Sequence, residues 1–551
     1  MRPTRFTDDM IKEYTEKGYW KETTYADLYE RNAKEYGDKV ALVDDSGHRL
    51  TWAQANQAID RLALKLVKLG FEKDDILVIQ LPNRVEVVLL LAACEKVGII
   101  SSTLVRTLRH KEIEYLLKIT EAKGYVSVWK FRDFDYYEMV QDIRSDLPKL
   151  KYIFTCGDET PEKAISIDEI LNEPLEEKYS IEEFKKRQIR FDEVGWLGLT
   201  SGTTGFPKIT QTPMALATSV APSHMSKIKM TGDDVVGALC PVSGAARGLL
   251  RFNPFVGATG VLMEHFDAEK AFKLIETEKI TIPMMVPAQL AMMAQNLNYT
   301  KYDLSSLRVF QVSGAPLPPH VANDVEKKFN CMVINHYGGM DAGSVASVDV
   351  DDSLEVRRFS VGKPHPGNEV KLLDDDGKEV GVGEVGTVYF RGPTSVGGYF
   401  KDPDMTNEAW GTGFFCMGDL AKKDEKGNLY VVGRKKDCII RGGYNIYPTE
   451  VESILTTHPK IVAAALVGYP DPIMGERACA YVVVKKGEIF SFDEMVAFFK
   501  TKQISANKTP ERMEIIDEMP LVSDMKLDKK VLKEDILNKV KAEEKGSNIK
   551  S

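Results

Sequence analysis

The segment "LTSGTTGFPK", residues 199–208, has the residue types of an anion-binding loop: two glycines, four hydroxyl side chains, a proline and a lysine. Glycines let the backbone close on a guest, while backbone N–H groups, hydroxyls and a lysine attract phosphate. The P-loop pattern fails, because Phe206 and Pro207 separate Gly205 from Lys208. The segment therefore indicates a phosphate site of another kind, with a surface turn rich in glycine and threonine as the alternative.

Five further segments carry glycines or polar groups suited to the same chemistry. In chain order they are "SGAPL" from Ser313, "NHYGGMD" from Asn335, "FFCMGDL" from Phe414, "GRKKDCIIRGGYNIYPTEVE" from Gly433 and "MPLVSDMKLDKK" from Met519. Taken alone, each has an ordinary explanation, such as a turn for a Gly-Asp pair or a solvated lysine near the C-terminus. Their significance comes from their combination and order.

Together the six segments resemble the signature motifs of the adenylate-forming superfamily, which includes acyl- and aryl-CoA synthetases, adenylation domains of peptide synthetases and luciferases. The resemblance covers about residues 12–540 and is closest to aryl-acid:AMP ligases and benzoate-type CoA ligases. It implies that ATP and a carboxylic acid form an acyl-adenylate, whose acyl group then passes to a thiol.

The resemblance implies two catalytic residues. Lys526 is expected to place positive charge on the α-phosphate, where the transition state concentrates negative charge. Asp341 is expected to bind Mg²⁺ together with Thr200, although the family usually has glutamate at the position of Asp341. Its side chain is one methylene shorter but remains a hard oxygen ligand.

The nucleotide site follows from the same resemblance. Tyr337 is expected to stack on adenine, Asp419 to accept from both ribose hydroxyls, and the loop that follows Leu199 to hold the departing pyrophosphate. The residues expected to bind the nucleotide and its phosphates are Thr200, Ser201, Gly202, Thr203, Thr204, Lys208, Gly314, Ala315, Pro316, His336, Tyr337, Gly338, Asp419 and Arg434.

The acyl pocket is expected to have no hydroxyl-specific hydrogen-bonding group. Hydroxybenzoate enzymes of the family carry a His-Asn pair where this chain has Gly244 and Ala245. A pocket without that partner penalises a buried ring hydroxyl, which favours a small unsubstituted cyclic acid, aromatic or alicyclic, such as a benzoate- or cyclohexenecarboxylate-like substrate. The expected lining residues are Ser243, Gly244, Ala245, Gly314, Gly338, Gly339 and Met340.

The second half of the reaction is expected to need a moving domain. Lys436 falls where the family has its hinge, and the text "GGYNIYP" is closer to that of CoA ligases than to that of siderophore adenylating enzymes. Coenzyme A is therefore the expected acceptor. The residues expected to line its tunnel are Arg441, Gly442, Gly443 and Tyr444.

Three other functions stay open. The nearest is an aryl-acid adenylating enzyme that loads a carrier protein, as in siderophore synthesis; the others are a luciferase-like oxygenase and an inactive nucleotide-binding protein. Met525 stands where glycine usually precedes the catalytic lysine, and Met340 replaces a hydroxyl residue. Both departures could slow the ATP-consuming direction. Because a thioester and a phosphoanhydride store comparable energy, the reaction could also run toward ATP.

The elements that must position these residues alternate between helices and short β-rich runs up to about residue 345, as in parallel sheets covered by helices. We expect an α/β fold whose large N-terminal domain, residues 1–435, has two helix-covered sheets and a β-barrel-like subdomain at about 355–432. A small mobile α+β domain is expected over residues 436–551.

Composition limits the remaining classes. The net charge of -9 is mild and the lysines are scattered, so nucleic acid is not an expected partner. Seven cysteines without a C-x-x-C pair favour a reducing compartment. No apolar run near the start is long enough for a bilayer. We expect a cytoplasmic monomer or homodimer that uses a small acid, ATP and CoA, with no integral membrane association.

Overall fold

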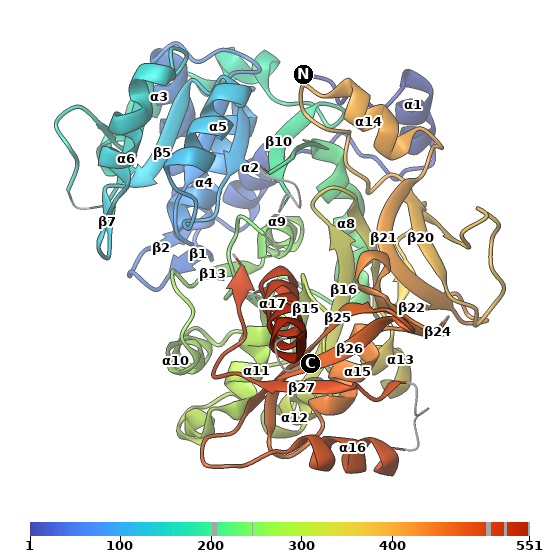
Figure 1. Ribbon diagram of the computed structural model, residues 1–551. Helices are drawn as coiled ribbons and strands as arrows, with labels where there is room; N and C mark the ends of the chain where they lie inside the picture. Colours follow the sequence, from blue (N-terminus) through green and yellow to red (C-terminus); the bar gives the residue numbers. More distant parts are fainter. Residues whose placement is uncertain are drawn as a thin grey trace.

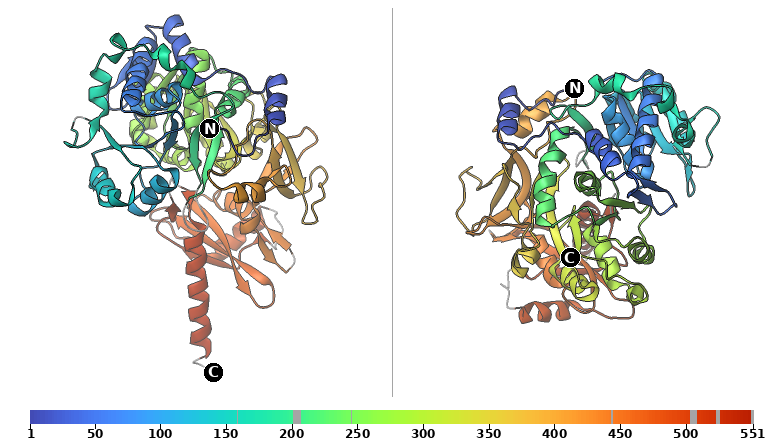
Figure 2. Two further views of the ribbon diagram at one scale, coloured as in Figure 1. Left: turned by 90° about the horizontal axis from the view of Figure 1, so that it is seen from above. Right: turned by 180° about the vertical axis from the view of Figure 1, so that it is seen from behind.

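The computed structural model describes residues 1–157, 159–200, 207–244, 246–442, 444–502, 508–522 and 526–548. Two large sheets and a smaller antiparallel sheet form the N-terminal part, and a further small sheet with its helices forms the C-terminal part (Figure 1). Seen from above, the C-terminal part lies along one side of the rest, and its last helix projects away from it (Figure 2).

The largest sheet has nine strands with a parallel centre and antiparallel edges. The pairs from β16 to β1 are parallel, whereas β16–β17, β17–β18 and β1–β2 are antiparallel. A parallel centre must be covered on both faces, which suits its apolar strands. In spatial order the strands are β18 (Lys363–Pro364), β17 (Gly343–Ser347), β16 (Met332–Gly339), β15 (Val309–Ser313), β14 (Ile282–Met285), β12 (Val235–Ala238), β13 (Thr259–Leu262), β1 (Val40–Asp44) and β2 (Arg49–Thr51).

The second sheet has seven strands and ends in the hairpin that carries the glycine-rich segment. All its pairs are parallel except β10–β11. In spatial order the strands are β11 (Ile209–Pro213), β10 (Val194–Leu199), β4 (Ile100–Thr103), β3 (Ile76–Gln80), β5 (Gly124–Val128), β8 (Tyr152–Cys156) and β9 (Ile165–Ser166).

Helices cover both sheets, and their ends follow local sequence rules. Thr51 and Gln54 form the capping box that begins α3, whose buried face includes Ile59 and Leu62. The helices of this part are α1 (Asp8–Glu16), α2 (Tyr25–Glu35), α3 (Trp52–Lys68), α4 (Val85–Lys96), α5 (His110–Thr120), α6 (Tyr136–Ile143), α7 (Ile167–Asn172), α8 (Met214–Lys227), α9 (Ala246–Val256), α10 (Ala268–Glu278), α11 (Pro287–Gln295), α12 (Pro319–Phe329), α13 (Leu354–Phe359) and α14 (Pro403–Trp410).

The β-rich subdomain is an open antiparallel sheet of four strands rather than a closed barrel. Its order is β19 (Glu369–Leu373), β20 (Gly386–Arg391), β21 (Phe415–Lys423) and β22 (Leu429–Arg434). Each strand pairs with the next in sequence, so β19 and β22 are the two edges. Four strands are too few to close around a packed interior.

The C-terminal part follows the short 3₁₀ turn η5 (Lys435–Asp437) and has its own core, which includes Val451, Leu466 and Phe499. In its sheet β23 lies between β24 and β26, β25 and β27 both pair with β26, and β28–β29 is a separate hairpin. The elements are β23 (Ile439–Arg441), β24 (Tyr444–Ile446), α15 (Pro448–Leu455), β25 (Ile461–Asp471), β26 (Gly475–Val484), α16 (Phe492–Thr501), β27 (Arg512–Ile515), β28 (Leu521–Val522), β29 (Lys526–Leu527) and α17 (Lys529–Asn548).

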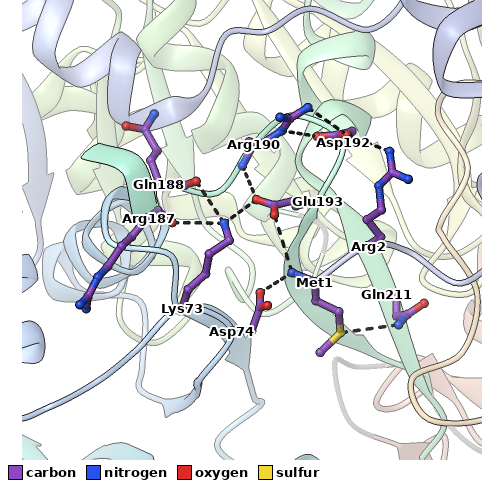
Figure 3. Close-up of polar contacts among 10 residues, drawn as sticks. All are labelled: Met1, Arg2, Lys73, Asp74, Arg187, Gln188, Arg190, Asp192, Glu193 and Gln211. Atoms are coloured by element: carbon purple, nitrogen blue, oxygen red, sulfur yellow. Dashed lines mark hydrogen bonds and ion pairs between the residues drawn. The ribbon is translucent and has the colours of Figure 1, made fainter. Parts of the chain in front are cut away.

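A polar network fixes the start of β10 (Figure 3). Lys73 Nζ lies 2.7 Å from Glu193 Oε2, and the amino group of Met1 pairs with Asp74. The carbonyl of Met1 accepts a hydrogen bond from the backbone of Val194 at 2.9 Å. These contacts hold the strand that leads into the glycine-rich segment against the N-terminal chain.

Within the described part of the chain, none of the helices combines the length and the apolar character that crossing a bilayer requires. All seven cysteines are free thiols.

We predict that Gly343→Ala lowers the urea midpoint of unfolding strongly. Gly343 has a φ of +112°, and a Cβ there would overlap the carbonyl oxygen of Thr394. We expect a cost of about 3 kcal/mol from backbone strain and overlap. Gly377 is the matched control: its φ is +77° with open space around it, so Gly377→Ala should cost only about 1 kcal/mol. Equal midpoints for the two variants would contradict this prediction.

Candidate active site

Side chains from three separate sequence motifs meet, because Tyr337 and Arg434 both contact the carboxylate of Asp419. Tyr337, on β16, donates its hydroxyl hydrogen to Asp419 Oδ2 at 2.5 Å. Arg434 Nε lies 2.8 Å from Asp419 Oδ1, and Arg434 Nη1 donates to the carbonyl of Met417 at 2.9 Å. Asp419 on β21 and Arg434 on β22 are directly paired residues, so the strand register brings them together.

Burial of the Asp419 side chain is the largest influence on the pKa of its carboxyl. Burial raises the pKa of its carboxyl, while the Arg434 guanidinium and the Tyr337 hydrogen bond oppose that rise. The pKa of Tyr337 is raised as well, by burial and then by the neighbouring carboxylate. A buried carboxylate flanked by one cation and one hydroxyl can accept further hydrogen bonds from a diol.

The glycine-rich segment connects β10 to β11, which pair as antiparallel strands. The backbone N–H of Thr200 donates to the carbonyl of Lys208 at 3.0 Å, which closes the base of the turn. Lys208 Nζ lies 5.1 Å from the centre of the Tyr399 ring. The expected phosphate-binding residues Ser201, Gly202, Thr203 and Thr204 lie outside the described residues.

The turn that carries Asp341 is attached to this hairpin. Thr210 Oγ1 donates to the carbonyl of Met340 at 3.0 Å. The charge of Asp341 contributes to raising the pKa of Tyr399, after burial, and also that of Asp419. Asp341, the expected metal ligand, therefore lies close enough to Tyr399 and Asp419 for its charge to act on both side chains. The side-chain hydroxyl of Thr210 was not among the expected site groups.

The glycines expected at the nucleotide and acyl sites surround Tyr337. The parallel register pairs Ser313 with His336, which brings the turn of Gly314, Ala315 and Pro316 beside β16. Gly314 has a φ of +91°, a conformation that favours glycine. A Cβ on Gly338 would overlap the carbonyl oxygen of Gly343, so only glycine fits there, and Gly339 follows it in the strand.

The expected acyl segment is held by a residue that the sequence did not reveal. Asn83 accepts from the backbone of Val242 at 2.9 Å and donates to the carbonyl of Cys240 at 2.8 Å. These bonds fix the loop that continues into Ser243 and Gly244, while Ala245 lies outside the described residues. Asn83 follows a buried strand in "LPN", which is too common a pattern to have signalled this contact.

His336, expected to contact the nucleotide, has its side chain packed against two other histidines. Its imidazole packs with those of His224 and His365, with ring centres 5.2 Å and 5.6 Å away. Neighbouring residues of a strand point to opposite faces, so this ring lies on the other face of β16 from Tyr337. Burial lowers the pKa of His224 to about 4 and those of the other two imidazoles well below the ordinary value.

The expected hinge and thiol-tunnel residues lie at the start of the C-terminal part. Lys436 is in η5, directly after Arg434 and the end of β22. Gly442 turns the β23–β24 hairpin with a φ of +56°, and a Cβ there would lie 2.7 Å from Met474 Cε. Arg441 Nε pairs with Glu511 at 2.6 Å, and the Tyr444 side chain is exposed. Gly443 lies outside the described residues.

Lys526 is placed by its backbone. It pairs with Val522 in the β28–β29 hairpin, immediately before α17. Its neighbour Met525 and its own side chain lie outside what the structure describes.

Comparison with known families decides the class of the chain. The model of the AMP-binding enzyme family matches residues 29–400, and that of the AMP-binding enzyme C-terminal domain matches residues 450–526. The chain belongs to the AMP-binding enzyme family. The recognition of an adenylate-forming enzyme and its α/β fold class are thereby confirmed.

Members of this family that resemble the chain include both CoA ligases and AMP ligases. The medium-chain fatty-acid–CoA ligase of Escherichia coli (strain K12) is 30% identical over 97% of this chain and 94% of its own length. The 2,3-dihydroxybenzoate-AMP ligase of Bacillus subtilis (strain 168) is 31% identical over 98% of both chains.

Among solved structures, the anthranilate CoA ligase AuaEII, in complex with anthranoyl-AMP, superposes with a TM-score of 0.83 at 25% identity, covering 92% of this chain and 96% of its own. This AMP-binding enzyme is an adenylate-forming ligase that uses ATP and a small-molecule acid.

We predict that Arg434→Met weakens AMP binding about tenfold or more. Methionine keeps the apolar length of the side chain but removes the cation beside Asp419, and a charge-assisted hydrogen bond is worth about 1.5–3 kcal/mol. Titration calorimetry with AMP measures the loss. Arg391→Met is the matched control, because Arg391 pairs with Glu369 at 2.8 Å on the surface of the same sheet. Wild-type AMP affinity in Arg434→Met would remove this residue from the site.

Proposed function

We propose that this enzyme is an AMP-forming acyl-CoA synthetase that activates a small, non-hydroxylated cyclic carboxylic acid, aromatic or alicyclic. The observation that carries the proposal is the Asp419 carboxylate, held between Tyr337 and Arg434 and coupled electrostatically to Asp341. That arrangement suits a ribose diol on one side and a phosphate chain on the other.

In the first half-reaction, a carboxylate oxygen of the acid attacks the α-phosphorus of ATP. The bond from that phosphorus to the oxygen bridging to the β-phosphorus breaks, and pyrophosphate leaves. Asp419 accepts from the ribose hydroxyls, and Tyr337 presents its ring to the adenine. Lys208 and the hydroxyls of the β10–β11 turn hold the pyrophosphate, and Lys526 neutralises charge at the α-phosphate.

The residues around Asp341 fit a magnesium ion. The Asp341 carboxylate adds to the negative potential at Asp419, and hard oxygen donors are the ligands that Mg²⁺ prefers. Asp341 and Thr200 would hold the ion, which when bound neutralises charge on the phosphates. Lys526 and Lys208 would add positive charge at the α-phosphate and the pyrophosphate, and Asp419 would orient the ribose.

Support for a cyclic acid comes from the pocket and the relatives. With Gly244 and Ala245 in place of a His-Asn pair, the pocket has no side chain there that reads a ring hydroxyl. Two of the similar structures are ligases of ring-bearing acids: the anthranilate CoA ligase and an o-succinylbenzoate CoA synthetase from Bacillus subtilis, with a TM-score of 0.77 at 25% identity and coverage of 92% of this chain and 97% of its own.

In the second half-reaction, the CoA thiolate attacks the acyl carbonyl and AMP leaves. We propose that the part of the chain from Lys436 onward rotates about η5, which exchanges Lys526 for the β23–β24 hairpin near the adenylate. Gly442 keeps that hairpin free of a side chain where a pantetheine arm would pass. The Arg441–Glu511 ion pair fixes the hairpin to the rest of the C-terminal sheet. The same chemistry can run toward ATP when acyl-CoA, AMP and pyrophosphate accumulate.

Carrier-protein loading is the second candidate. It is favoured by the similarity to the Bacillus subtilis 2,3-dihydroxybenzoate-AMP ligase and by a 30% identity with enterobactin synthase component E of Escherichia coli (strain K12), over 98% of this chain and 99% of that protein. The text of the β23–β24 hairpin, "RGGYNIYP", favours CoA instead.

We predict that Lys526→Ala slows acyl-adenylate formation about 100- to 1,000-fold, because it removes the charge that stabilises the transition state. Acid-dependent pyrophosphate exchange measures this step. Thioester formation from a synthetic acyl-adenylate should stay within a few-fold of wild type. Lys533→Ala, at an exposed position on α17, is the control and should behave as wild type. Adenylation at the wild-type rate in Lys526→Ala would refute the mechanism.

We predict that benzoate or an alicyclic analogue gives a kcat/KM at least about tenfold above that of 2,3-dihydroxybenzoate, with CoA as acceptor. Pyrophosphate release over a panel of acids, followed by thioester detection with CoA or an aryl carrier protein, tests both parts. A preference for the dihydroxy acid would contradict the pocket assignment. Acylation of the carrier protein without thioester formation on CoA would establish the second candidate.

A further inference from the structure

Three histidines from distant segments converge beneath the nucleotide site. His224 lies in the last turn of α8, His336 lies in β16, and His365 directly follows β18. One ring nitrogen of each lies within 4.8 Å of the others. We call this group the histidine cluster. The function proposed above uses none of these three imidazoles.

Several nitrogens of the histidine cluster are buried without hydrogen-bond partners among the described residues. They are both ring nitrogens of His224, Nδ1 of His336 and Nε2 of His365. The amide of Gln311 is close enough to influence the pKa of His224, yet its oxygen has no partner within hydrogen-bonding geometry either. A buried polar atom without a partner costs about 1–3 kcal/mol. Several such atoms side by side indicate that something satisfies them.

The remaining nitrogens of two of these rings are already engaged. His336 Nε2 lies 3.1 Å from Ser344 Oγ, and His365 Nδ1 lies 3.1 Å from Ser223 Oγ. A neutral imidazole has one N–H and one lone pair. When each N–H donates to its serine, the lone pairs are on Nδ1 of His336 and Nε2 of His365. Imidazoles that bind metals are oriented in this way by a second hydrogen bond.

We propose that the histidine cluster binds one divalent transition-metal ion, with zinc as the expected ion. Three imidazole nitrogens and a solvent molecule form a common zinc site. Zinc–nitrogen bonds of about 2.0–2.1 Å place two donors of a tetrahedral site about 3.4 Å apart. The ring nitrogens lie within 4.8 Å of one another, so binding the ion would draw the three rings closer together.

The surroundings also constrain the fourth ligand. Lys227 Nζ donates to the carbonyls of Ser347 and Lys363 at 2.7 Å and 3.2 Å, so a cation is held near the cluster. Three neutral ligands do not reduce the charge of the ion. A hydroxide derived from zinc-bound water would reduce it, because zinc lowers the pKa of its water to about 7. We therefore expect zinc with three imidazoles and a solvent-derived anion.

The ion would serve as a structural link. It joins the C-terminal end of α8 to β16 and to the chain after β18, and β16 carries Tyr337 on its other face. Zinc would therefore stabilise the strand that presents the adenine-stacking ring. This role is independent of which acid or acceptor the enzyme uses.

The test is metal binding by the full chain, without a polyhistidine tag and after removal of metals with a chelator. We expect one zinc per chain by elemental analysis after zinc addition and gel filtration, and a melting temperature that rises with zinc. Cobalt(II) should give the visible absorption of a tetrahedral site. His224→Gln and His365→Gln should each weaken zinc binding by at least about 100-fold and abolish the thermal shift.

His110→Gln is the matched control, because His110 is an exposed histidine on α5. It should bind zinc as the wild type does. Ser223→Ala preserves all three ligands and should weaken zinc binding about tenfold, which tests the site even where a histidine variant fails to fold. The proposal is overturned if wild-type protein retains no zinc, or if His224→Gln and His365→Gln retain it with unchanged affinity. Neither readout depends on ligase activity, so loss of the proposed function would leave this result intact.

Discussion

The hydrogen bond from Tyr337 to Asp419 is the contact on which the site depends, because it joins two sheets. Tyr337 belongs to the nine-stranded sheet and Asp419 to the four-stranded sheet. Burial makes this carboxylate costly to ionise, and Arg434 from the neighbouring strand offsets that cost. A polar contact of this kind is strong only while water is excluded, so the strength of the Tyr337–Asp419 hydrogen bond depends on the packing of the two sheets.

A second contact adds the third sheet. The Thr210–Met340 hydrogen bond ties the hairpin of the seven-stranded sheet to the turn that carries Asp341. The hairpin of the seven-stranded sheet, the turn that carries Asp341 and Asp419 on the four-stranded sheet thus meet at one junction. Backbone segments approach closely at this junction, so a Cβ on Gly338 or Gly343 would overlap a carbonyl oxygen.

The two faces of β16 have different chemistry. One face presents Tyr337 toward Asp419, and the other presents His336 to two further imidazoles. The strand is therefore constrained from both sides, by a hydrogen bond above and by the histidine cluster below. The histidine face is built from residues on α8, on β16 and in the segment after β18.

The sequence by itself determined the family, the α/β class, the helix beginning at Trp52 and the motif residues around Tyr337, Asp419 and Arg434, because capping, periodicity and short motifs are local properties of the chain. Tertiary structure alone decided that the His336 ring packs against His224 and His365, that Asn83 holds the loop before Ser243 and that the small sheet stays open. These features depend on strand register and helix packing between segments that lie far apart in the chain, or on which strand edges stay unpaired. Local residue spacing encodes none of these.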